Sequence, residues 1–180
     1  LARTGLLEAM REVYGQLAQG IYGLRATAMV LALMALLRRP RPEALKERDP
    51  AALGDVLGLA RAPEVKTLRR KLNEVAQHKK AHALWQALAR RWLAERRDLL
   101  GILYTDGHVR CYHGKHKLPK AHVTQRNQSL PATTDTWVND VDGQPVFVVT
   151  SSANEGLTQL LLAIIDEATL LGGGKKGTVV

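Results

Sequence analysis

The carboxylate of Asp106 is a candidate for metal-dependent chemistry, and it stands in the short sequence YTDGH between two apolar runs. At the end of a buried strand, its hard oxygen atoms could bind a divalent ion such as Mg²⁺. The same Asp106-Gly107 pair, flanked by apolar residues, also predicts the turn of a β-hairpin. A single acidic residue does not decide between these interpretations, and both stay open.

A second candidate is the basic segment of residues 63–77, whose residue types suit contacts with nucleic acid. Val65, Leu68, Leu72 and Val75 recur every three or four residues and predict one apolar helix face. The rest of that helix surface carries Lys66, Thr67, Arg69, Arg70 and Lys71. Together with a short helix before it, the segment resembles a helix-turn-helix, whose second helix can lie in a major groove. Its cations would neutralise phosphates and contact guanine edges. The alternative is a solvated basic face of an ordinary helix bundle.

Histidines and the single cysteine could form a zinc site. They cluster within 15 residues, as His108, Cys111, His113, His116 and His122. Zinc sites of this type use pairs of cysteines, and this chain has only one, so polar loop residues or DNA-facing residues are the competing interpretation. His78 and His82 are four apart on a predicted helix, but Lys79 stands where a zincin needs glutamate.

The length and composition narrow the class of protein. A chain of 180 residues with 46% apolar residues can bury a core and is not wholly disordered. A single cysteine, Cys111, excludes a disulfide framework and fits a reducing cytosol. The most apolar run, residues 26–37, is shorter than the roughly 20 residues of a membrane span. We therefore expect a buried core helix there and no contact with a membrane.

The net charge of +9 is unevenly placed along the chain. Residues 61–97 contain 11 basic and 3 acidic side chains, whereas residues 127–180 contain 2 basic and 6 acidic ones. Such a basic centre indicates a polyanionic partner, with nucleic acid ahead of membrane.

The elements that must position these residues change type near residue 98. Before it, periodicity and capping signals predict helices at residues 6–17 (capped by Gly20), 26–37, 49–58, 63–77 and 82–97. After it, apolar and aromatic runs predict strands at residues 100–105, 109–113, 133–139 and 145–150, followed by a helix at 157–171 and the start of a strand at 178–180. Asp142-Gly143 predicts a second hairpin turn, and residues 114–128 are predicted as loop.

This order predicts an α+β protein with two domains. Residues 1–97 form an all-helical, helix-turn-helix-like DNA-binding region, and residues 98–180 form the first part of an α/β domain.

Several separated blocks of the chain resemble the DDE transposases of bacterial insertion sequences. The blocks are Tyr22–Arg25, Ala62–Leu72, Leu103–Lys115, Thr133–Asn139 and Asp142–Val149. The resemblance covers most of residues 14–180 and implies a truncated ribonuclease-H-like catalytic domain, in which acidic residues hold two metal ions.

In that family pattern the first acid ends the first strand, and Asp106 matches it as a ligand of Mg²⁺ or Mn²⁺. Asp135, Asp140 and Asp142 do not match the later acids and are expected to be strand and turn residues. The implied partner is double-stranded DNA at the ends of the element. Further backbone contacts are expected from Lys115, Lys117, Lys120 and Arg126. The implied location is the bacterial cytoplasm, at the nucleoid, and a homodimer is possible in the full-length protein.

The second acid should follow the strand that starts at Thr178, which is where the sequence stops. We therefore expect an N-terminal fragment that is inactive alone, because the second and third acids are missing. The alternative is a catalytically inactive DNA-binding protein derived from a decayed or repurposed transposase.

Overall fold

The computed structural model describes residues 4–18, 20–95, 102–123, 127–153, 155–172 and 178–179. The chain divides into two compact units, Leu1–Ala87 (unit 1) and Leu88–Val180 (unit 2), and each is considered by itself. The predicted domain boundary, between residues 97 and 98, lies outside the described residues.

Unit 1 is helical, and its described helices correspond to predicted segments except for the 3₁₀-helix η2, which was not predicted. They are α1 (Leu6–Tyr14), α2 (Leu24–Leu36), the 3₁₀-helix η2 (Pro42–Glu47), α3 (Pro50–Leu57), α4 (Val65–Gln77) and the first part of α5 (Ala81–Glu95). The predicted end of the first helix is wrong, because α1 stops at Tyr14. Gly15 follows with a φ of 65°, a left-handed conformation that favours glycine, so the helix ends before Gly20.

The ends of α3 follow from its sequence. The Asp49 side chain accepts hydrogen bonds from the backbone N–H groups of Ala51 and Ala52, and Pro50 occupies the first helical position. Gly58 closes the helix with a φ of 65°. The short helix is therefore fixed at both ends by residues that the sequence already identifies.

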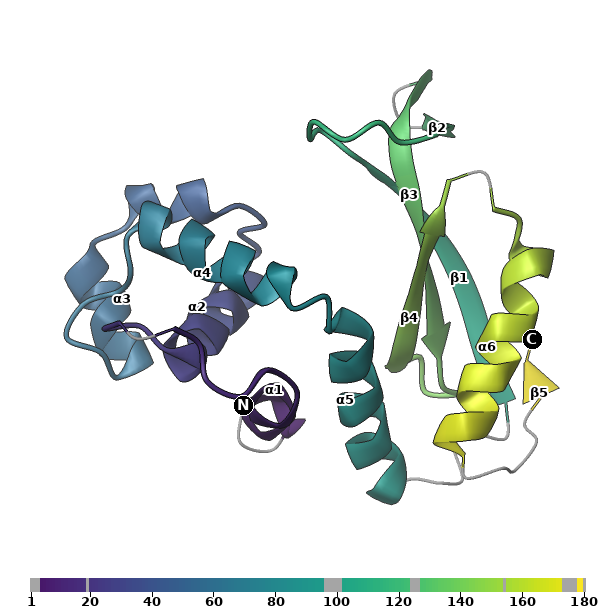
Figure 1. Cartoon of the computed structure of the whole chain (residues 1–180), viewed down its shortest axis with the longest axis horizontal. Coiled ribbons are helices and arrows are strands. Elements are labelled where there is room, and N and C mark those ends of the chain that lie inside the picture. The colour runs from purple at the N-terminus through teal and green to yellow at the C-terminus, as the bar shows by residue number, and fades with distance from the viewer. Residues whose placement is uncertain are drawn as a thin grey trace. The chain divides into compact units, whose positions relative to one another are not determined.

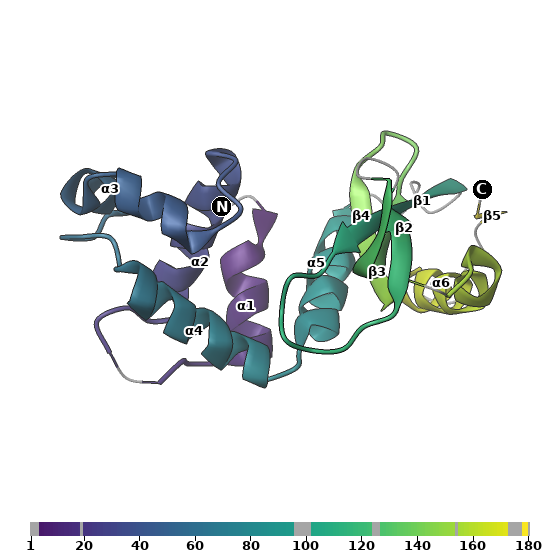
Figure 2. The ribbon, with the colours of Figure 1, turned by 90° about the horizontal axis from the view of Figure 1, so that it is seen from above.

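The centre of unit 1 is α2, which contacts α1, α3 and α4; Figure 2 shows these helices around it. Val30 and Met34 of α2 pack in one buried cluster with Leu45, Leu57, Ala62 and Leu68. Leu24 and Ala28 of α2 pack in a second cluster with Met10, Tyr14 and Leu17. The prediction of a buried core helix is confirmed. Among the helices in the described part of the chain, none is long and apolar enough to cross a membrane.

Unit 2 contains a mixed β-sheet (Figure 1). Its strands are β1 (Ile102–Cys111), β2 (Lys120–Val123), β3 (Gln128–Asn139), β4 (Pro145–Ser152) and β5 (Thr178–Val179). β3 pairs antiparallel with β1, β2 and β4, whereas β5 pairs parallel with β1. Helix α6 (Leu157–Leu171) connects β4 to β5, as predicted.

The prediction of a hairpin turn at Asp106-Gly107 is wrong, because β1 runs through both residues. Tyr104 to Cys111 pair without interruption with Asn139 to Ala132 of β3. A two-residue hairpin of the usual type needs positive φ angles, and Gly107 has none. The long partner strand therefore keeps the chain extended across a dipeptide that would otherwise favour a turn.

Two other strand predictions have different outcomes. Asp142-Gly143 does form the turn between β3 and β4, with a φ of 73° at Gly143. The predicted loop of residues 114–128 is wrong in part, because Lys120–Val123 forms β2 against the first residues of β3.

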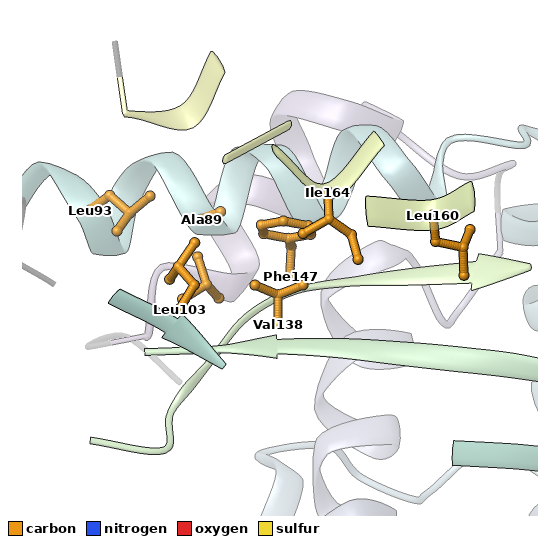
Figure 3. Close-up of a cluster of buried hydrophobic side chains, with 8 residues drawn as sticks. Ala89, Leu93, Leu103, Val138, Phe147, Leu160 and Ile164 are labelled. Atoms are coloured by element: carbon orange, nitrogen blue, oxygen red, sulfur yellow. The ribbon is translucent and has the colours of Figure 1, made fainter. Parts of the chain in front are cut away.

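The core of unit 2 lies between one face of the sheet and two helices. Figure 3 shows Leu103, Val138 and Phe147 pointing from the strands toward α5 and α6. The buried cluster comprises Ala89, Leu93, Leu103, Val138, Val146, Phe147, Leu160 and Ile164. Because side chains alternate along a strand, the odd-numbered residues of β1 face this core and the even-numbered ones face outward. The name "outer face" is used below for that second side of the sheet.

Candidate functional site

Helix α4 carries the predicted apolar face. Leu68 is only 1% exposed, and Val65 and Leu72 pack against the same buried cluster. Val75 packs against the neighbouring cluster with Tyr14. The helix is therefore held to unit 1 along one side, which leaves the other side for its polar residues.

The opposite side of α4 presents cations. Lys66, Arg69 and Arg70 are exposed, and Thr67 is half-buried. Arg69 forms an ion pair with Glu43 of η2 but keeps 61% of its side chain exposed. The three basic side chains can therefore reach a ligand in solution.

Lys71 departs from the prediction that it projects into solution, since it is only 3% exposed. Its Nζ atom donates to the carbonyl oxygen of Ala18 at 2.8 Å and to Oε2 of Glu74 at 3.0 Å. The Ala18 N–H donates to Oε1 of Glu74, so the pair clamps both polar groups of Ala18. We call Lys71, Glu74 and Ala18 the α4 clamp. The ammonium of Lys71 therefore stabilises the fold of unit 1 and does not face solution.

The turn between α3 and α4 is fixed by backbone contacts. The N–H of Leu59 donates to the carbonyl of Gly54 at 2.9 Å, and that of Ala62 donates to the carbonyl of Pro50 at 2.8 Å. The Tyr22 hydroxyl donates to the carbonyl of Arg61 at 3.0 Å. These bonds set the point from which α4 starts.

We expect Gly54→Ala to destabilise unit 1 by roughly 1–3 kcal/mol, because its new methyl group would meet backbone atoms. An added Cβ would lie 2.7 Å from both the Cα atom of Arg61 and the carbonyl oxygen of Leu59. Gly20→Ala is the matched control, since a Cβ at Gly20 has open space around it. Urea denaturation followed by circular dichroism measures both variants. Equal midpoints for the two would contradict the close packing of the turn.

A hollow of about 620 Å³ opens beside the start of α4. Its apolar part includes Leu45, Leu53 and Val65, and its cations are Lys46, Arg48, Lys66 and Arg69. Lys46 and Arg48 thus lie beside the exposed cations of α4, although Glu64 also lines the hollow and makes its charge mixed.

A second group of cations lies in residues 112–120, which run from the end of β1 to the first residue of β2 and which we call the basic arm. Lys115, Lys117 and Lys120 are exposed there, as predicted, and Arg126 lies outside the described residues. The rings of Tyr112 and His116 stack with centroids 6.3 Å apart. The N–H of Tyr112 donates to the Pro131 carbonyl, and that of Ala132 to the Pro119 carbonyl. Both ends of the basic arm are therefore attached to β3 (Figure 1).

Asp106 lies in the middle of β1, paired with Trp137 of β3, so the prediction that it ends a buried strand is wrong. Its side chain is exposed on the outer face. The strand rule places His108 and Arg110 on the same face. The carboxylate is thus on a regular strand rather than in a loop, where the backbone fixes its position.

Asp135 is a strand residue and Asp140 is a turn residue, as predicted. The Asp140 carboxylate accepts hydrogen bonds from the N–H groups of Asp142 and Gln144, both at 2.9 Å, and so stabilises the β3–β4 turn. Asp135 lies within β3, and only 9% of its side chain is exposed. Its carboxylate contacts Arg110 of β1 and Thr150 of β4. Sequence reasoning did not single out Arg110, although its alternation with Asp106 along one strand was a usable signal.

The histidines and Cys111 are not gathered into a metal site in the described part of the chain, where no group of three or more such ligands could hold an ion. The prediction that His78 and His82 share a helix is wrong. α4 ends at Gln77 and α5 begins at Ala81, with a left-handed Lys79 between them. The ring of His78 instead meets that of Tyr14 edge-on, at 5.9 Å.

Comparison with known proteins identifies one related family. A family model described as a transposase protein matches residues 1–173. Searches of the curated proteins and of the solved structures found no match. The matched range includes α4, the basic arm and Asp106.

Proposed function

The chain belongs to this family of transposases, which are DNA-cutting enzymes, and from that premise we propose a role for each unit. Unit 1 binds duplex DNA through α4, which acts as the second helix of a helix-turn-helix. Unit 2 is the start of a ribonuclease-H-like catalytic domain of the DDE type, with Asp106 as its first acid. DNA at the ends of the mobile element is the substrate, bound by two copies of the protein.

The order of strands in unit 2 is the observation that carries this proposal. An antiparallel set, with β3 between β1 and β4, is followed by α6 and then by β5, which lies parallel to β1. A ribonuclease-H-like domain begins with that arrangement and carries its first acid at the end of its first strand. Asp106 matches the strand but lies in its middle. Asp106 stands on β1, three residues after Leu103, where the described part of β5 ends its pairing with β1.

The chemistry of Asp106 suits Mg²⁺ or Mn²⁺. Mg²⁺ commonly uses one or two protein carboxylates and takes its other ligands from water and substrate phosphates, so one exposed carboxylate fits part of its shell. When bound, the metal ions would activate the attacking water or 3′-hydroxyl and stabilise the leaving oxygen. Asp106 itself would hold the ions against the scissile phosphate, because β1 fixes its Cα position in the sheet.

The two positive surfaces support the binding of DNA. On α4 the contacts are assigned to Lys66, Thr67, Arg69 and Arg70, which are exposed or half-buried. On the basic arm they are assigned to Lys115, Lys117 and Lys120. Lys71 is left out of this set because its ammonium is already bonded within unit 1.

Replacing Lys66, Arg69 and Arg70 together by alanine is expected to weaken binding to duplex DNA at least tenfold at low salt. Each phosphate contact contributes about 0.9 to the slope of log affinity against log salt, so the slope should shrink by roughly two to three. Fluorescence anisotropy with a labelled duplex over a range of salt concentrations measures both quantities.

The control is Arg11→Ala with Arg25→Ala, which removes exposed arginines from α1 and α2. It should leave the slope close to that of the unaltered chain. Absence of DNA binding at low salt, or an unchanged slope in the triple variant, would contradict the role of α4.

A further inference from the structure

Arg110 is held in one orientation on the outer face of the sheet. Its Nε atom lies 3.2 Å from Oδ2 of Asp135, and its Nη2 atom donates to Oδ1 at 3.3 Å. The Thr150 hydroxyl donates to the same Oδ1 atom at 2.8 Å. Three strands thus contribute to this triad of Arg110, Asp135 and Thr150.

Burial within the triad is unequal. The side chain of Asp135 is only 9% exposed, whereas that of Arg110 is 62% exposed. A buried carboxylate therefore fixes the inner edge of an arginine whose outer edge faces solution. A guanidinium has five N–H donors in one plane, so the Nη1 atom remains available to a ligand.

The triad shares a face with Asp106. Asp106 and Arg110 are both even-numbered residues of β1, and Asp135 lies opposite His108, which stands between them on that face. By the rise of a strand, Asp106 and Arg110 are on the order of 13 Å apart. A single DNA strand along β1 could meet both side chains.

We propose that Arg110 is a phosphate-binding residue that places the DNA strand relative to Asp106, and that Asp135 and Thr150 position its guanidinium. This inference rests on the proposed function, since it assumes that DNA approaches the outer face of unit 2. Arginine suits the role because its planar donors match the oxygen atoms of a phosphate in bidentate fashion. Fixing the guanidinium beforehand reduces the entropy lost when the phosphate binds.

The first test is the salt dependence of DNA binding by the Arg110→Gln variant of the whole chain. The probe is a labelled duplex in EDTA, so that metal binding at Asp106 plays no part. Loss of one phosphate contact should reduce the slope by about 0.9 and weaken binding several-fold. Arg25→Gln, which changes the charge equally on α2, is the control and should leave the slope unaltered. An unaltered slope for Arg110→Gln overturns the proposal.

The second test asks whether Asp135 positions the guanidinium of Arg110 or only neutralises its charge. If Asp135 positions Arg110, Asp135→Asn weakens DNA binding although it removes a negative charge, and Thr150→Val weakens it in the same direction. If Asp135 only neutralises Arg110, then Asp135→Asn strengthens binding, which overturns the positioning role. In the Arg110→Gln background, neither substitution should weaken binding further.

These results are distinct from a failure of the proposed function. If the triple α4 variant reduces the salt slope but Arg110→Gln leaves it unaltered, this inference alone is rejected. A chain that binds no duplex at low salt would reject both.

Discussion

Replacement of Asp106 by asparagine is expected to abolish strand cleavage by the complete transposase, with a fall in rate on the order of a thousandfold. Asparagine has nearly the size of aspartate but lacks the charge that holds a divalent metal ion. The backbone of residue 106 pairs with Trp137 in either case, so β1 stays intact. Because the side chain is exposed, the folding stability should change by less than about 0.5 kcal/mol.

Cleavage of a labelled duplex that carries an element end measures this effect, and anisotropy on the same duplex measures binding. Binding should not fall, because the proposed phosphate contacts belong to other residues. Asp166→Asn, at another exposed carboxylate of unit 2, is the control and should cleave normally. Cleavage at the normal rate by Asp106→Asn would contradict the metal-binding role proposed for Asp106.

Lys71→Met is expected to lower the unfolding temperature of unit 1 on the order of 10 °C. Methionine preserves most of the apolar stem but leaves the carbonyl of Ala18 without its donor and Glu74 without its counter-ion. Lys66→Met, at an exposed lysine of the same helix, is the control and should have little effect. Adding Glu74→Gln to Lys71→Met should recover part of the loss, because it removes the uncompensated charge. Equal melting of Lys71→Met and Lys66→Met would contradict the α4 clamp.

The α4 clamp also makes unit 1 sensitive to acid. The hydrogen bonds from the Ala18 N–H and from Lys71 hold the pKa of Glu74 below its usual value of 4.5. A carboxyl group with a lowered folded-state pKa stabilises the fold above its unfolded pKa and loses that contribution as the pH falls through the folded one. Unfolding midpoints measured below about pH 4.5 should therefore decline less in Glu74→Gln than in the unaltered chain.

Much of the fold could be predicted because its signals are local. The limits of α3 follow from Asp49, Pro50 and Gly58, each of which acts on its own neighbours. The apolar content of residues 157–171 likewise defines α6 from end to end. Such elements depend on capping and periodicity, which the sequence shows directly.

The incorrect predictions concern residues whose state depends on distant partners. Asp106-Gly107 and Asp142-Gly143 are the same dipeptide, yet only the second is a turn. The difference lies in β3, which is long enough to pair with all of β1 beyond residue 104. Lys71 shows the same dependence, since the group that keeps it buried belongs to Ala18, far away in the sequence.

The residue types of the candidate site could be predicted from the sequence, but most of the contacts between their side chains could not. Asp106 and the cations of α4 stand out by their sequence alone. The contact of Arg110 with Asp135 could not be found without the register of β1 against β3, which places His108 opposite Asp135. A one-residue slip in that register would move the carboxylate to the other face of the sheet.

The parallel pairing of β1 with β5 has a consequence for how the polypeptide folds as it leaves the ribosome. Ile102 pairs with Thr178, so the two strands belong to opposite ends of the sequence of unit 2. Contacts between such distant segments form slowly, whereas helices with nearby partners form quickly. Because synthesis proceeds from the N-terminus, the helices of unit 1 can form while unit 2 is still being made. Until β5 has been synthesised, the edge of β1 that pairs with it stays open, and an open strand edge can pair with another chain.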